Sequence, residues 1–216
     1  SIPFAGLTED GLPTFINQDG QKTISSFNFQ EYEKLDFLKY EGPTDPTITG
    51  SFGNILTYKN LKLNVFVTYS FGNVIRLDPV FSNAYSDLDA MPKEFKNRWM
   101  KAGDENVTNI PTIVSTRMNQ QYAYLNMAYN AYNYSDVRIA DGGFIRLKEI
   151  SLSYDLPAKV INFFRLNKLQ LKLQATNLCL LYADSKLNGQ DPEFFRSGGV
   201  STPVPKQFTF TVRLGL

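Results

Sequence analysis

Apolar and polar side chains alternate along several stretches of this chain, and no other feature of the sequence constrains its fold as strongly. A two-residue period is the pattern of a β-strand with one apolar face, because successive side chains point to opposite faces. The clearest stretches cover residues 61–71, 168–177 and 207–216. Fainter ones cover residues 49–58 and 144–156. In the last of these the phase slips near Lys148 and Glu149, which predicts a β-bulge or a change of environment there.

Alternation does not say whether the apolar face meets a protein core or lipid. One interpretation is a soluble antiparallel β-sandwich that carries its polar residues outward. The other is a transmembrane barrel, which crosses the bilayer with tilted strands of about ten residues and alternates short turns with long loops. The expected strands have that length and those connections, which favours the barrel. Aromatic residues also stand near the ends of the apolar faces, as membrane girdles do: Tyr58, Tyr69, Phe71, Tyr154 and Phe208.

On the barrel interpretation, the apolar side chains of three strands face lipid and the alternating polar ones face the lumen or a plug. The lipid-facing set is Leu63, Val65, Val67, Leu169, Leu171, Leu173, Phe208, Phe210, Val212 and Leu214. The polar set includes Lys168, Gln170, Lys172, Gln174, Thr209 and Arg213. Replacing Leu214 by arginine distinguishes the two environments, because arginine costs about 2–4 kcal/mol at the midplane of a lipid face.

Composition removes several classes of function. The 216 residues include 22 Lys and Arg against 21 Asp and Glu, so a net charge of +1 gives no electrostatic case for a nucleic-acid partner. The lack of histidine excludes Ser-His-Asp triads and histidine-ligated metals. A single cysteine builds neither an internal disulfide nor a thiolate metal site. We therefore expect no catalytic residue, no metal and no cofactor.

Helical spacing is scarce. Residues 88–100 place Met91, Phe95 and Trp99 four residues apart, and residues 157–166 begin with a proline, so each segment is predicted to contain a helix. The longest apolar run has six residues, Leu178–Ala183. A membrane-spanning helix needs about 18 or more.

Several segments carry motifs beyond alternation. They are TGSFGNILTYKNLKLNVFVTYSFGNVI (49–75), NRWMKAGDENVTNIP (97–111), DGGFIRLKEISLSY (141–154) with Leu156-Pro157, LQLKLQATNLCLLY (169–182), Asp191-Pro192-Glu193 and TPVPKQFTFTVRLGL (202–216). In this order they resemble the C-terminal part of the SusC/RagA-type TonB-dependent outer-membrane transporters of Bacteroidetes. Cys179 stands where an aromatic residue is more usual, and Leu216 where the usual terminal residue is phenylalanine.

The resemblance implies an all-β fold, formed by the C-terminal strands of a large transmembrane antiparallel β-barrel with about 22 strands in the complete protein. Five strands cannot close a barrel. The chain is therefore expected to pair with the remainder of the same barrel and with a plug domain that is absent from this chain. The implied segments are an extracellular loop (1–47), a β-hairpin (48–77), a long extracellular loop (78–142), a strand-turn-strand unit (143–178), an extracellular loop (179–206) and a closing strand (207–216).

The resemblance also implies a function and partners. Such a protein imports oligosaccharides or peptides across the outer membrane together with a SusD/RagB-like surface lipoprotein. It receives energy from TonB through the missing N-terminal part, and outer-membrane lipid surrounds its barrel. The alternative that the residues leave open is a soluble carbohydrate-binding β-sandwich.

Aromatic residues of the long loop are the candidates for contact with a substrate or partner, because tyrosine offers a flat face and a hydroxyl. They are Trp99, Tyr122, Tyr124, Tyr129, Tyr132 and Tyr134. Packing of the loop onto itself is the stronger expectation, with Trp99 as an anchor beside a turn at Gly103-Asp104. The carboxylates of Asp191 and Glu193 are candidate ligands for Ca²⁺ together with nearby carbonyls, but a plain turn is favoured.

Overall fold

The computed structural model describes residues 1–27, 33–86, 88–163, 166–195 and 205–215. Within it the chain divides into two compact units, each built from two separate stretches of sequence. Unit 1 comprises Ser1–Gly42 and Val74–Ala140, and unit 2 comprises Pro43–Asn73 and Asp141–Leu216. Among the described residues, no helix is both long and apolar enough to cross a membrane.

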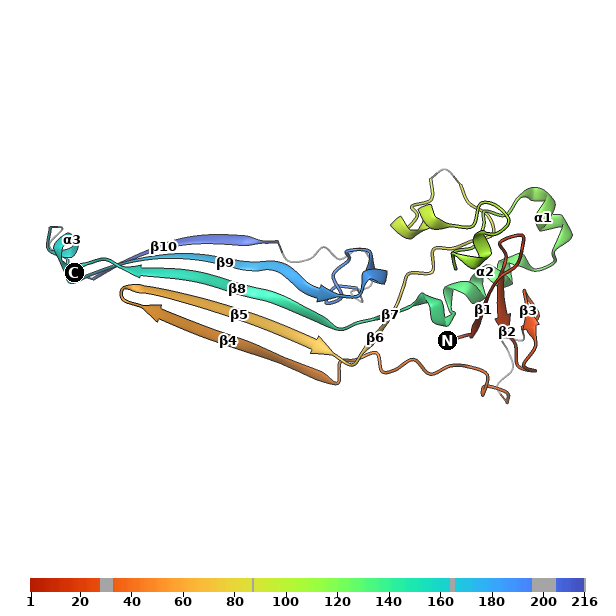
Figure 1. Ribbon diagram of the computed structural model, residues 1–216, viewed down its shortest axis with the longest axis horizontal. Helices are drawn as coiled ribbons and strands as arrows, with labels where there is room; N and C mark the ends of the chain where they lie inside the picture. The colour runs from red at the N-terminus through yellow and green to blue at the C-terminus, as the bar shows by residue number, and fades with distance from the viewer. Residues whose placement is uncertain (28–32, 87, 164–165, 196–204, 216) are drawn as a thin grey trace. The chain divides into compact units, whose positions relative to one another are not determined.

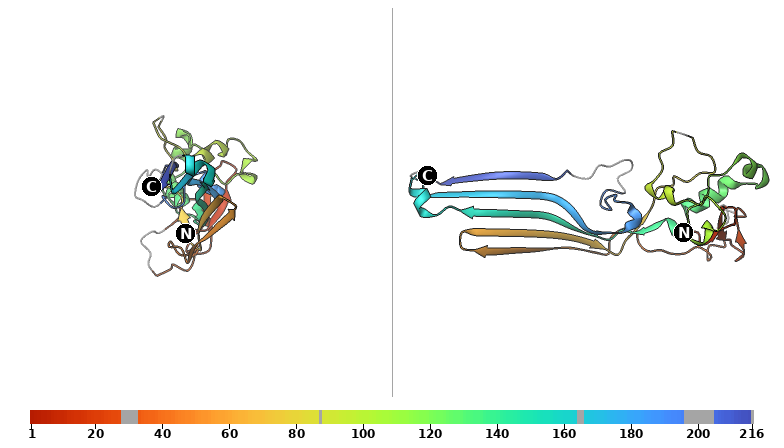
Figure 2. Two further views of the ribbon diagram at one scale, coloured as in Figure 1. Left: turned by 90° about the vertical axis from the view of Figure 1, so that its left-hand side faces the viewer. Right: turned by 45° about the horizontal axis from the view of Figure 1, so that its top comes forward.

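Unit 2 is dominated by one antiparallel sheet of five strands, in the order β10-β9-β8-β5-β4. Their long ribbons run side by side in Figures 1 and 2. The strands are β4 (Ile48–Tyr58), β5 (Leu61–Phe71), β8 (Phe144–Asp155), β9 (Lys168–Ala183) and β10 (Gln207–Gly215). Each overlaps one of the five alternating stretches of the sequence. β9 extends beyond the stretch 168–177 to Ala183, so the first residues of the segment 179–206, predicted as a loop, are strand. Leu216, the expected last residue of the closing strand, lies outside the described residues.

The bulge predicted near Lys148 and Glu149 is confirmed. Phe66 of β5 pairs with Glu149, but the next residue of β5, Val67, pairs with Leu147, so Lys148 is an extra residue in β8. The pairing of β8 with β9 shifts at the same place. There Asn177 adopts a positive φ of 54°. The bulge explains the change of phase in the sequence, because one inserted residue reverses the face of every residue beyond it.

Register brings the apolar residues of all five strands onto one face. Leu56 pairs with Leu63, Leu63 with Leu152, Leu152 with Leu173, and Leu173 with Phe210. Leu56, Leu173 and Phe210 are about 60% exposed. The opposite face is polar, and one of its rows reads Thr57, Lys62, Ser153, Lys172 and Thr211.

The two ends of the sheet differ in their connections. At one end, β4 and β5 are joined by a hairpin turn in which Lys59 has a positive φ of 51°. At the same end β8 and β9 are joined through α3 (Ala158–Phe163), within the helix predicted over 157–166. Figure 1 shows α3 beside the end of β10. The long segments of the sequence all leave from the other end of the sheet.

Unit 1 has a small three-stranded sheet of β1 (Phe4–Leu7), β2 (Pro13–Ile16) and β3 (Lys22–Thr23). It also contains α1 (Thr116–Gln121), α2 (Leu125–Asn133) and the short pair of β6 (Val74–Arg76) and β7 (Ile139–Asp141). One core joins its two stretches of sequence, since the ring of Phe4 lies 5.9 Å from that of Phe15 and 5.8 Å from that of Tyr132, edge to face. Two segments predicted as loops, 1–47 and 78–142, thus contribute to one packed body.

The helix predicted over 88–100 is wrong in extent. Only a short 3₁₀ helix forms, η1 (Lys93–Asn97), flanked by Pro92 and Arg98 in extended conformations. Pro92 accounts for the start, because proline is not tolerated within a helix and restricts the residue before it. The remaining short 3₁₀ helices are η2 (Asp104–Asn106), η3 (Asp136–Arg138) and, in unit 2, η4 (Ser185–Leu187).

Candidate functional site: an apolar sheet face and a polar cavity

The apolar face of the unit 2 sheet is bounded by aromatic residues along its strands. Near one end, the ring of Phe71 lies 6.1 Å from Tyr69 and 6.2 Å from Tyr182. Near the other end, Tyr58 and Tyr154 are 69% and 39% exposed. β5 has 11 residues, which at about 3.4 Å each and a tilt near 40° cross roughly 29 Å, enough for the apolar band of about 25 Å in outer-membrane barrels.

All ten residues predicted to face lipid lie on this apolar face, as the register shows. Five of them are exposed in unit 2: Leu173, Phe208, Phe210, Val212 and Leu214. The other five, on β5 and in the first half of β9, are half-buried among their neighbours. Lipid contact by these residues stays a prediction. Their shared face and exposure are the structural features on which it depends.

The loop around Trp99 forms a tightly bonded turn in unit 1. The indole Nε1 donates a hydrogen bond of 3.0 Å to Oε2 of Glu105, and the N–H of Gly103 donates one of 2.8 Å to the same oxygen. Asp104 Oδ2 accepts from the N–H groups of Met100 and Lys101, both at 3.1 Å. These bonds account for an anchoring role of the Trp99 side chain.

A glycine makes room for the same indole ring. Gly11 has a φ of +75°, and a Cβ built there would lie 2.4 Å from a ring carbon of Trp99. A larger residue at position 11 is thus disfavoured by the positive φ and would clash with the Trp99 ring.

The loop tyrosines separate into two groups by exposure. Tyr129 and Tyr132 are 1% and 2% exposed, and the hydroxyl of Tyr129 donates to the carbonyl oxygen of Thr112 at 2.5 Å. Burial raises the pKa of both tyrosines, so both stay neutral. Their side chains form part of the core of unit 1, which agrees with packing of the loop onto itself; contact of these two with a substrate or partner stays a prediction.

The remaining tyrosines keep accessible surface. Tyr122 donates a hydrogen bond of 3.0 Å to Asp10. Tyr124 is 69% exposed and has a positive φ of 61°. Tyr134 is 45% exposed and lies 5.4 Å from the guanidinium of Arg76 in a cation–π contact. Contact of these residues with a ligand stays a prediction.

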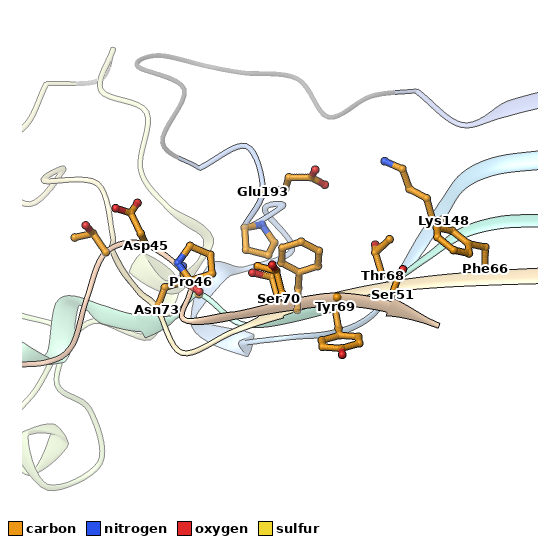
Figure 3. Close-up of a pocket in the computed structure, with 16 residues that line it drawn as sticks. Asp45, Pro46, Ser51, Phe66, Thr68, Tyr69, Ser70, Asn73, Lys148 and Glu193 are labelled. Atoms are coloured by element: carbon orange, nitrogen blue, oxygen red, sulfur yellow. The ribbon is translucent and has the colours of Figure 1, made fainter. Parts of the chain in front are cut away.

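Sequence reasoning missed a cavity on the polar side of the unit 2 sheet. It has a volume of about 670 Å³ and lies where β5 ends and β8 begins. Figure 3 shows Asp45 at one end of it and Lys148 at the other, with Glu193 on the same side of the sheet. Hydroxyl groups of Thr49, Ser51, Thr68 and Ser70 line the strand wall. The one indication of this site in the sequence was the change in the alternation of apolar and polar residues at Lys148, which lines the cavity.

A buried ion pair holds the turn whose Pro192 and Glu193 line this cavity. Nη2 of Arg146 lies 2.5 Å from Oδ1 of Asp191 and 3.2 Å from Oε2 of Glu193. The side chains of Arg146 and Asp191 are each 7% exposed, and that of Glu193 is 43% exposed. Asp191 Oδ1 also accepts from the N–H of Glu193 at 3.1 Å. The Asp-Pro-Glu motif is thus a turn fastened to β8 by arginine, and its acids serve an ion pair.

Comparisons with known proteins agree with the architecture. No family model matches the chain. The TonB-dependent receptor P3 of Formosa agariphila is 26% identical over 189 residues, which cover 88% of this chain and 16% of that protein. A structure of the RagAB peptide importer in the open-open state has a TM-score of 0.66 at 20% identity and covers 100% of this chain and 22% of its own. A closed-closed structure gives a TM-score of 0.64 at 22% identity, covering 99% of this chain and 22% of its own.

The chain therefore spans less than a quarter of the length of the proteins it matches. These findings support a fragment of SusC/RagA type, with the antiparallel strands of an outer-membrane barrel that the fragment does not close. The matched proteins are receptors and importers, not enzymes, in agreement with the expectation drawn from composition.

Proposed function

We propose that this chain forms the C-terminal part of the wall and the outer loops of an outer-membrane, TonB-dependent nutrient importer. The carrying observation is the apolar face, which continues across all five strands of the sheet through paired residues while remaining exposed. Lipid covers such a face in a barrel, and the rest of the barrel pairs with the edge strands β4 and β10. The matched receptor and importer support the transport function.

Orientation follows from the lengths of the connections. In bacterial outer-membrane barrels the short turns face the periplasm and the long loops face outward. The hairpin at Lys59 and the connection through α3 would then be periplasmic. Unit 1 and the segment 179–206 would be extracellular, where unit 1 offers exposed aromatic residues such as Tyr124 and Tyr134 to a SusD/RagB-like lipoprotein. The RagAB importers, which match this fold, support such a pairing.

The soluble β-sandwich finds no support among the described residues. A sandwich buries the apolar face of one sheet against a second sheet. In unit 2, Leu56, Leu173 and Phe210 of that face remain about 60% exposed. The three-stranded sheet of unit 1 buries its own residues, including Phe15, in a separate core.

Uptake measurements test the proposal. Cells that produce the complete protein should accumulate labelled oligosaccharides or labelled peptides, and deletion of its gene should abolish uptake of one of these classes. Deletion of tonB should abolish the same uptake while leaving the protein in the outer membrane. Recovery of the complete protein from the soluble fraction without detergent would contradict the proposal.

A further inference from the structure

The β8 bulge places an unpaired positive charge at the cavity on the polar face. Because two residues of a bulge oppose one on the partner strand, a bulge re-aims a side chain that regular alternation would direct elsewhere. Figure 3 shows Lys148 on the same side of the sheet as Thr68 and Ser51, whereas Tyr69 points to the other side. In the part of the chain that the structure describes, the Lys148 ammonium has no ion pair or hydrogen bond.

Other charged groups near Lys148 already have partners. Glu193 is bonded to Arg146. Glu149, the neighbour of Lys148, accepts from Asn64 at 3.3 Å and lies 3.9 Å from Lys172. The ammonium of Lys148 is therefore the group at this end of the cavity that remains available for an anionic ligand.

An exposed aromatic ring accompanies this charge. Phe66 lines the cavity on the polar side and is 36% exposed. Its ring lies over Gly53, where a built Cβ would be 3.1 Å from it, so the glycine accommodates the ring. Lys148 lines the same cavity, and Figure 3 draws both side chains at the same end of it. Exposed apolar surface rimmed by polar groups often marks a binding site. Phe66, surrounded by hydroxyl and charged groups, is such a surface.

We propose that this end of the cavity is a subsite for a substrate segment that carries a carboxylate beside an apolar face. Lys148 takes the carboxylate, Phe66 packs against the apolar face, and the hydroxyls of Ser51 and Thr68 bind neighbouring polar atoms. The pair of Arg146 with Asp191 and Glu193 holds the opposite wall in place. The inference rests on the proposed transport function, which puts this cavity at the outer end of the lumen.

Two ligand sources share this chemistry. One is the C-terminal carboxylate of a peptide that ends in an apolar residue, and the other is an acidic sugar whose ring stacks on phenylalanine. Two probe pairs distinguish them: a pentapeptide ending in leucine against its C-terminal amide, and an oligogalacturonate against its methyl ester. In each pair only the charge of the carboxylate differs appreciably.

Binding to the purified complete transporter, in complex with its lipoprotein partner, tests the subsite. We expect one charged probe to bind at least ten-fold more tightly than its neutral partner, because hydrogen bonds to charged groups are the strong ones. The substitution Lys148→Gln should remove this preference and leave binding of the neutral probe unchanged. Lys172→Gln, which removes a lysine of the polar face that does not line the cavity, is the matched control and should preserve the preference.

Three results would overturn the subsite. They are equal binding of the charged and neutral probes in both pairs, a charge preference that survives Lys148→Gln, and loss of thermal stability in Lys148→Gln without any ligand effect. The last would show that Lys148 pairs with the plug or the remaining barrel. TonB-dependent uptake would persist in all three cases, so they are distinguishable from failure of the transport function itself.

Discussion

Arg146 on β8 and Asp191, which follows β9, form a buried ion pair with 2.5 Å between Nη2 and Oδ1, although 45 residues separate them in sequence. Removing one partner of such a pair leaves an uncompensated buried charge, which typically costs about 3–5 kcal/mol. Replacing both partners by apolar residues of similar size is often neutral or stabilising. The pair therefore fastens the Asp-Pro-Glu turn to the sheet, and its two members should depend on each other.

We expect Arg146→Met to release this turn while the sheet stays folded. Limited trypsin digestion of the complete protein should show faster cleavage at the nearby exposed Lys186. The double substitution of Arg146→Met with Asp191→Leu should restore much of the resistance. Lys172→Met removes a longer, partly exposed pair with Glu149 at 3.9 Å, so its effect should stay below about 1 kcal/mol. Unchanged cleavage in Arg146→Met would show that the ion pair does not hold the turn.

A new positive charge should destabilise the folded barrel on one face of β10 and have little effect on the other. Phe210→Arg and Leu214→Arg put a cation on the exposed apolar face, whereas Thr211→Arg puts it on the polar face. We expect a cost of about 2–4 kcal/mol for an arginine near the membrane midplane and of about 0–1 kcal/mol near an interface. Phe210→Arg should therefore reduce the folded fraction more than Leu214→Arg, which lies nearer the end of the strand.

The folded fraction in membranes can be read by electrophoresis without boiling, which separates folded barrels from unfolded chains. Thr211→Arg is the control and should fold like the unaltered protein. Equal losses for all three substitutions would contradict a lipid-facing side of β10.

Acid should loosen the turn that Trp99 anchors. Hydrogen bonds to the Glu105 carboxylate, first from its own backbone N–H and then from the Trp99 indole, lower the pKa of that carboxyl from its ordinary value of 4.5. Because the folded-state pKa is depressed, this contribution to stability is complete above the ordinary value. It is lost as the pH falls through the lowered pKa.

Fluorescence of Trp99, the one tryptophan of this chain, reports the change. The difference spectrum between the complete protein and its Trp99→Phe variant should shift to longer wavelength as the pH falls through the lowered pKa of Glu105. In Glu105→Gln the carboxylate is absent, so the spectrum should lack this acid transition. A transition that persists in Glu105→Gln would assign it to another carboxyl group.

The sequence predicted unit 2 far better than unit 1, for a physical reason. A strand with one apolar and one polar face alternates apolar and polar residues along its whole length. The five strands and the bulge at Lys148 could therefore be predicted from the sequence. Unit 1 is held by contacts between distant segments, such as Phe4 with Tyr132, and such contacts leave no local period. Its helix α2 is built largely from tyrosine and asparagine, which are weak helix formers, and its stability comes from burial of one side.

The candidate site was predictable only in part for the same reason. Tyr129 and Tyr124 look alike in sequence, but one is buried and the other is exposed. Lys148 was visible as a phase slip, yet the cavity beside it depends on the turn that Arg146 draws against the sheet. Spatial pairing across 45 residues has no signal in a single sequence.

Membrane orientation gives the last prediction. If the long connections are extracellular, a cysteine at position 124 should react with a membrane-impermeant maleimide in intact cells, since Tyr124 is 69% exposed. A cysteine at position 60, in the hairpin turn that Asn60 shares with Lys59, should react only after the outer membrane is opened. Both substitutions, Tyr124→Cys and Asn60→Cys, are made with Cys179→Ala, because Cys179 is itself exposed in this chain. The Cys179→Ala protein without a new cysteine is the background control. Labelling at position 60 but not 124 in intact cells would reverse the orientation, and with it the assignment of the Lys148 cavity to the outer end of the lumen.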